Sequence, residues 1–126
     1  MHYDLIVKIK NAEKAGKNII LVPFSGPDFS VAKVLAGAGY LSGVQKKVFG
    51  KKSFMEIKLR QENGGNVIDG FKIISKPGRR IYVGYRDVKP VKYGHGMGII
   101  STPGGILSDK EARKSKVGGE YLLEIW

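Results

Sequence analysis

A polar segment with a glycine pair, "QENGGN" at residues 61–66, constrains the fold most, because it divides the 126 residues into nearly equal halves. Before it, apolar residues recur at the spacings of helices and longer strands. After it, short strand patterns alternate with glycine and proline. A unit of about 60 residues buries only about 60% of its unfolded surface, so each half would be marginally stable alone. We therefore predict an α+β chain of two small domains, residues 1–63 and 64–126.

The first half follows the order α-β-α-β-β. Apolar residues at helical spacing predict two helices, the first capped by Asp4 and the second with Pro27 in its first turn. Glycine follows each helix as a stop signal, at Gly16 and Gly39. The predicted strands cover residues 18–22, 40–49 and 53–60, and the last two form a hairpin around Gly50-Lys51-Lys52.

The second half is predicted to be mostly antiparallel β-structure with one short helix. That helix covers residues 109–116, because Ser108 and Glu111 match a capping box. "KPGR" at residues 76–79 has proline and glycine placed for a type II turn. The predicted strands are residues 67–75, 80–84, 97–101, 105–107 and 120–126.

The charge of the chain points to a polyanionic partner. Lysine and arginine total 22 against 11 acidic residues, a net charge of +11. Residues 1–63 carry 11 basic and 5 acidic groups, and residues 64–126 carry 11 and 6, so both halves share the excess. Nucleic acid is the commonest polyanion that a cytoplasmic protein meets. The cytoplasm is the expected location, because the chain has no cysteine, no secretory signal and no apolar run of membrane-spanning length.

The residues give no positive support for an enzyme. The two histidines, His2 and His95, have no Ser-plus-acid pattern nearby, and "GHGMG" lacks the spacing of a dinucleotide-binding fingerprint. Two separated histidines do not form a metal-binding cluster. We expect no catalytic residues, no metal and no cofactor.

Two turns in the second half are rich in glycine, and the first also carries two hydroxyl groups. Ser101, Thr102, Pro103, Gly104 and Gly105 lie between two strand patterns, and Gly118, Gly119 and Glu120 follow the predicted helix. Taken alone, the first reads as a hairpin turn and the second as a helix stop. Hydroxyls can also bind base edges or ribose, and glycine lets a phosphate approach the backbone. Neighbouring cations and an aromatic residue complete the RNA-binding prediction: Lys52, Lys76, Arg79, Arg80, Tyr82, Lys110, Arg113 and Lys114.

Several stretches resemble the small-subunit ribosomal protein family conventionally numbered eight, of the bacterial type. The resemblance rests on "ISKPGRRIYV" (74–83), "GMGIISTPGGILSDKEAR" (96–113) and "GGEYLLEIW" (118–126). "DLIVKIKNA" (4–12), "VPFS" (22–25) and "LAGAGYL" (35–41) extend it over the whole chain, in the family's order.

The resemblance implies a function as well as a fold. Family members have an α/β domain followed by a β-rich domain, and they bind a helix in the central domain of small-subunit rRNA early in assembly. The expected partners are therefore that rRNA and neighbouring ribosomal proteins, with no membrane, for a chain that is monomeric outside the ribosome. The family's Ser-Thr-Ser-x-Gly loop corresponds to residues 101–105, where Pro103 replaces the second serine and removes one hydroxyl and one N–H.

Other functions remain open at this stage. Bacterial members of the family can also repress translation by binding the messenger RNA of their own operon. A regulatory module whose main target is messenger RNA or DNA is therefore one alternative. A small enzyme that acts on an anionic substrate is another, weaker alternative.

Overall fold

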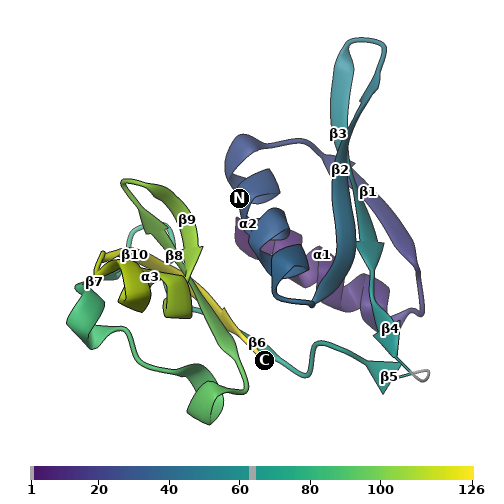
Figure 1. The fold of residues 1–126 in the computed structure, drawn as a ribbon. Helices are drawn as coiled ribbons and strands as arrows, with labels where there is room; N and C mark the ends of the chain where they lie inside the picture. The colour runs from purple at the N-terminus through teal and green to yellow at the C-terminus, as the bar shows by residue number, and fades with distance from the viewer. Residues whose placement is uncertain (1, 63–64) are drawn as a thin grey trace. The chain divides into compact units, whose positions relative to one another are not determined.

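The computed structural model describes residues 2–62 and 65–126. The chain forms two compact units, Met1–Ile68 and Asp69–Trp126 (Figure 1). The predicted boundary between residues 63 and 64 lies outside the described residues. Both units combine helices with antiparallel sheet, which confirms the α+β prediction.

The N-terminal unit is a three-stranded sheet with two helices. Its order α-β-α-β-β is confirmed: α1 (His2–Lys14), β1 (Ile19–Pro23), α2 (Gly26–Gly37), β2 (Leu41–Phe49) and β3 (Lys52–Leu59). The strands pair antiparallel in the order β1-β3-β2, so β3 is central. The loop from Gly50 to Lys51 has two residues, and Gly50 takes the positive φ of +63° that a type II′ turn requires at this position.

Apolar side chains from both helices and the central strand fill the core of this unit. Ile9 of α1, Leu35 of α2 and Ile57 of β3 are completely inaccessible to solvent. Each such side chain contributes about 1.5–3 kcal/mol relative to an exposed position. The helical spacing that predicted α1 and α2 therefore reflects real core contacts.

A buried carboxylate connects α1 to the end of the unit. Glu13 is only 4% exposed. Its two carboxylate oxygens accept the backbone N–H of Ile68 at 3.1 and 3.3 Å, and Lys10 forms an ion pair with it at 3.4 Å. Lys10 also donates to the Ile68 carbonyl. These bonds fix the chain where the N-terminal unit ends.

One local prediction in this half was wrong. Helix α1 starts at His2, so Asp4 lies in the first turn, where its charge complements the helix dipole, and is not the cap. The polar segment at residues 61–66 contains two short paired strands, β4 (Gln61–Glu62) and β5 (Gly65–Asn66). Polar residues form these strands because strand pairing satisfies the backbone whatever the side chains are.

The C-terminal unit is a five-stranded antiparallel sheet with one α-helix. Its elements are β6 (Phe71–Ile73), β7 (Tyr82–Val83), β8 (Met97–Thr102), β9 (Gly105–Ser108), α3 (Asp109–Ser115) and β10 (Gly119–Ile125), with 3-10 turns at Tyr85–Asp87 and Val91–Gly94. The strand order is β6-β10-β8-β9, and β7 also pairs with β10. The strand predicted over residues 67–75 is shorter: only Phe71–Ile73 forms a regular ladder with β10. Just beyond it, the N–H groups of Ile74 and Ser75 both donate to the Leu122 carbonyl, which interrupts the regular pairing.

Helix α3 covers one face of this sheet. Ala112 of α3 packs in one buried cluster with Val88, Ile100 of β8 and Tyr121 of β10. Side chains alternate between the faces of a strand, so the neighbours of Ile100 and Tyr121 project from the face that α3 does not cover. Both the capping box and the type II turn are confirmed.

The capping and turn contacts are specific. The Ser108 hydroxyl accepts the Glu111 N–H at 3.2 Å, and it donates to the Glu111 carboxylate at 3.2 Å. Gly78 has φ of +80°, and the N–H of Arg79 donates to the Lys76 carbonyl at 2.9 Å. Among the described residues, no helix has both the length and the apolar character needed to cross a membrane.

Candidate nucleic-acid interface

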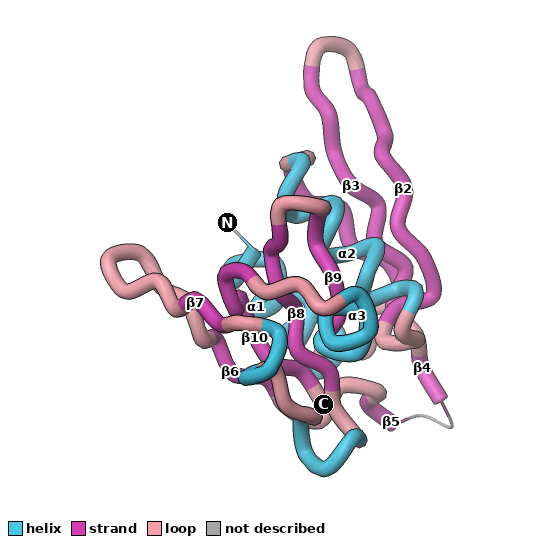
Figure 2. The backbone as a smooth tube through the Cα atoms, turned by 60° about the vertical axis from the view of Figure 1, so that its left-hand side comes forward, coloured by secondary structure: helices cyan, strands magenta, loops and turns pink. Residues whose placement is uncertain are grey.

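The stretch from Ser101 to Gly105 is the tip of the β8–β9 hairpin (Figure 2). Thr102 pairs with Gly105, which leaves Pro103 and Gly104 as a two-residue turn. Pro103, Gly104 and Gly105 are all exposed. Gly105 has φ of +119°, a conformation that favours glycine. The structure thus presents an open, small-residue tip at the edge of the sheet.

Thr102 is committed to the turn itself. Its hydroxyl donates to the Gly105 carbonyl at 2.8 Å and accepts the Gly104 N–H at 3.2 Å, and the residue is 9% exposed. A hydroxyl with both bonds made inside the turn has little left for a ligand. Thr102 therefore shapes the tip, whereas Ser101 is partly exposed.

The glycine pair Gly118-Gly119 allows close packing of strands. A Cβ at Gly119 would lie 2.0 Å from the Ser101 carbonyl oxygen, and one at Gly118 would lie 2.3 Å from the Val83 carbonyl oxygen. Glycine at these positions lets β10 pair with β8 on one side and β7 on the other. The pair therefore has a structural role, and it brings Glu120 beside Ser101.

Strand pairing places four side chains in one line across the sheet. Ser101 pairs with Ile106 of β9 and with Glu120 of β10, and Glu120 pairs with Tyr82 of β7. We call Ile106, Ser101, Glu120 and Tyr82 the cross-strand row. Paired residues share a face, and this face is opposite to that of Ile100 and Tyr121, so α3 does not cover the row. Tyr82 is 69% exposed.

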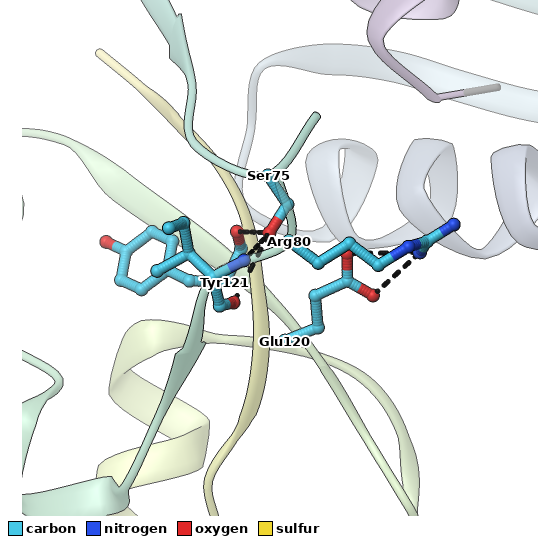
Figure 3. A network of polar contacts seen from close by, with 5 residues as sticks. Ser75, Arg80, Glu120 and Tyr121 are labelled. Carbon is cyan, nitrogen blue, oxygen red and sulfur yellow. Dashed lines mark hydrogen bonds and ion pairs between the residues drawn. The ribbon is translucent and has the colours of Figure 1, made fainter. Parts of the chain in front are cut away.

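Arg80 lies beside Glu120 of the cross-strand row (Figure 3). One guanidinium nitrogen of Arg80 lies 3.3 Å from each carboxylate oxygen of Glu120. Arg80 is exposed, whereas the Glu120 side chain is 16% exposed. The carboxylate therefore orients the guanidinium at the surface, which leaves its other N–H groups available for an anion.

A buried serine fixes the segment that carries Arg80. Ser75 is 3% exposed; its hydroxyl donates to the Tyr121 carbonyl at 2.7 Å and accepts the Ile81 N–H at 3.0 Å (Figure 3). Lys76 and Arg79 are exposed on the turn between Ser75 and Ile81. Three predicted cations, Lys76, Arg79 and Arg80, thus lie on one short connection beside β10.

The predicted cations of α3 belong to the other face. Arg113 pairs with buried Asp109 at 2.9 Å, and Asp109 also accepts the Gly98 N–H at 3.1 Å. Lys110 and Lys114 are exposed on the helix that packs over Ile100. The structure therefore does not bring the α3 cations to the cross-strand row. Lys52 lies in the N-terminal unit, at the start of β3.

The covered face also contains a tyrosine that stays protonated. Burial, followed by the charge of Glu124, raises the pKa of Tyr121 well above its usual range. Its hydroxyl donates to the Glu124 carboxylate at 3.0 Å. Within residues 2–62 and 65–126, His, Asp and Glu form no group of three that could hold a metal ion.

Sequence reasoning missed the interactions that build this surface. The pairing of Arg80 with Glu120, separated by 40 residues, follows from strand register. The role of Ser75 likewise depends on β10 lying beside its segment. No local sequence pattern encodes either contact.

The family model described as Ribosomal protein S8 matches residues 3–126. The chain belongs to this family. Curated relatives named small ribosomal subunit protein uS8 agree over nearly the whole chain: that of Mycoplasmopsis agalactiae is 39% identical, and those of Erythrobacter litoralis and Acetivibrio thermocellus are each 40% identical. Each alignment covers 98% of this chain and 94% of the relative.

Membership confirms the resemblance found in the sequence motifs. The chain is a ribosomal protein of the small subunit, a structural component of translation and not an enzyme. Its location is the ribosome. Ribosomal RNA and other ribosomal proteins are accordingly its class of partner.

Proposed function

We propose that this protein binds a helix in the central domain of small-subunit rRNA and promotes the assembly of that domain. The cross-strand row is the observation that supports this most. Three separate strands bring Ser101, Glu120 and exposed Tyr82 into line, with Arg80 beside them. The excess of 11 positive charges supplies attraction to the phosphates.

Each group of the surface has a distinct role in this proposal. Ser101 offers a hydroxyl that can bind a base edge or a ribose 2′-hydroxyl. Tyr82 offers a ring for stacking on a base that is displaced from the RNA helix. Arg80, oriented by Glu120, binds phosphate. The hairpin tip from Pro103 to Gly105 lets the RNA backbone approach closely because it has little side chain.

Side chains cannot read the deep, narrow major groove of regular A-form RNA. The target is therefore an irregular helix with at least one unstacked base. The α3 lysines and the other exposed cations contribute long-range attraction without sequence preference.

Filter binding of the whole protein to a central-domain rRNA transcript tests the proposal. We expect Tyr82→Leu to weaken binding by about 1–3 kcal/mol, because it removes one stacking ring. Ser101→Ala should cost about 1 kcal/mol. Neither change removes a cation, so the dependence of log K on log salt should keep its slope in both variants.

Lys114→Ala is the matched control, because Lys114 is exposed on the helix over the opposite face. It should reduce binding to all RNAs alike and make the salt slope less steep by at most about 1. If Tyr82→Leu binds like the unchanged protein, or if Lys114→Ala shows the larger loss of specific binding, the proposal is wrong.

A further inference from the structure

The β2–β3 hairpin of the N-terminal unit is a surface that the cross-strand row does not use. The pairing of β3 with β1 ends where Pro23 meets Phe54, whereas β2 and β3 continue to the pair of Phe49 with Lys52. The end of the hairpin is therefore a two-stranded ribbon. Figures 1 and 2 both show it projecting beyond helices α1 and α2 of its own unit.

One face of this ribbon combines two aromatic rings with two lysines. Strand pairing places Lys47 opposite Phe54, and Phe49 opposite Lys52. The two pairs are two positions apart on each strand, so all four side chains share a face. The rings of Phe49 and Phe54 are 5.9 Å apart between centroids, and Phe49 is 57% exposed. We call Lys47, Phe49, Lys52 and Phe54 the hairpin patch.

The charge at the end of the hairpin, around the hairpin patch, is mostly positive. Residues 45–54 contain Lys46, Lys47, Lys51 and Lys52 and no acidic residue. A carboxylate oxygen of Glu56, further along β3, lies 3.9 Å from the ammonium nitrogen of Lys47. Lys46 is on the other face, where its ammonium lies 4.3 Å from the centroid of the Phe24 ring. Lys52 and Lys51 remain beside the exposed ring, at the end of the ribbon.

An exposed phenylalanine lowers the solubility of a protein, and Phe49 is not one of the buried residues that form the core of its unit. Lysine is depleted in protein–protein interfaces, whereas an accessible ring flanked by cations is the usual arrangement for binding single-stranded nucleic acid. A base can stack on the ring of Phe49 while Lys51 and Lys52 contact neighbouring phosphates. Stacking of this kind accepts any base, because each base has a π-face.

We propose that the hairpin patch is a second RNA contact of this protein, which binds an unpaired segment of small-subunit rRNA by stacking on Phe49. The inference depends on the proposed function only for the identity of the RNA. It assigns a different kind of target, a single-stranded segment, to a different unit of the chain.

Val48 supplies a matched control for Phe49. It is the neighbouring residue, it is 61% exposed, and it projects from the opposite face of the same ribbon. Phe49→Leu keeps an apolar side chain and removes the ring, and Val48→Ala removes a comparable exposed apolar surface from the other face. Thermal unfolding of both variants checks that the hairpin change leaves the fold intact.

The experiment measures the affinity and the hydroxyl-radical footprint of the whole protein on small-subunit rRNA, without other ribosomal proteins. We expect Phe49→Leu to weaken binding at least about fivefold and to lose protection of a short unpaired segment. Val48→Ala should bind like the unchanged protein. Lys51→Gln combined with Lys52→Gln should make the salt slope less steep by about 2, one for each lost phosphate contact.

The outcomes separate this inference from the proposed function. If Phe49→Leu weakens binding while Tyr82→Leu does not, the hairpin patch stands and the proposed role of the cross-strand row fails. If Phe49→Leu has the affinity and the footprint of the unchanged protein, the inference is wrong, and a protein neighbour becomes the occupant of the hairpin. Equal losses in Phe49→Leu and Val48→Ala would also overturn it.

Discussion

At the scale of single residues, glycine in this protein has two different uses. Gly119 leaves room for a neighbouring strand, since any Cβ there would lie 2.0 Å from the Ser101 carbonyl oxygen. Gly104 lies in an open turn, where the nearest atom to an added Cβ is the Thr102 hydroxyl oxygen at 3.8 Å. The first use belongs to the fold, and the second leaves space for a ligand.

This difference predicts opposite results for the same substitution. Gly119→Ala should lower the free energy of unfolding by about 1–3 kcal/mol or more, because a backbone clash forces β10 and β8 apart. Gly104→Ala should change stability by no more than about 0.5 kcal/mol. Urea unfolding measures both values. Equal stability of the two variants would show that the close approach of β10 to Ser101 is not required.

At the scale of elements, the sequence predicted those helix starts, turns and strands that depend on contacts between residues close together in the chain. Ser108 and Glu111 predicted the start of α3, and "KPGR" predicted its turn, because the capping and turn bonds join residues at most three positions apart. The alternation of Met55, Ile57 and Leu59 predicted β3 for a similar reason, since one face of that strand meets the core.

The arrangement of the candidate site could not be predicted in this way. The sequence placed Ser101, Thr102 and the α3 cations close together along the chain, and the structure separates them by face. Thr102 turns inward to its own hairpin, and Ala112 directs α3 to the face of Ile100. Which face a side chain occupies depends on strand register, and register is set by packing across the whole sheet.

Tyr121, on the face of the sheet that α3 covers, predicts how the stability of the fold depends on pH. The pKa of Tyr121 is raised in the folded state by burial, whereas an unfolded tyrosine loses its proton near pH 10. Above about pH 10 the unfolded chain therefore binds fewer protons than the folded chain, and stability falls as the pH rises. Below pH 10 this contribution is fully present.

Tyr121→Phe removes this titration. We expect the unfolding midpoint in urea to fall less between pH 9 and pH 11 in the variant than in the unchanged protein. The other titratable groups are the same in both proteins, so the comparison isolates the effect of Tyr121. An identical fall in the two proteins would mean that the Tyr121 hydroxyl is not held protonated by its burial.

At the scale of the whole molecule, the chain divides RNA recognition between close contacts and general attraction. Each half carries a similar positive excess, so both units are drawn to RNA. The cross-strand row and the hairpin patch then supply specific contacts from separate units. Two modest contacts on one chain can together give tight binding, because the first raises the effective concentration of the second.

Directed cleavage of rRNA from a tethered iron chelate tests the central claim most directly. The chain has no cysteine, so a single introduced cysteine takes the label alone. Gly104→Cys places it at the open hairpin tip beside the cross-strand row, and Lys114→Cys places it on the helix over the opposite face. We predict strong cuts from position 104, grouped in one irregular helix of the central domain, and weaker cuts from position 114. Stronger cleavage of that helix from position 114 would contradict the claim that the hairpin tip and the cross-strand row bind the RNA.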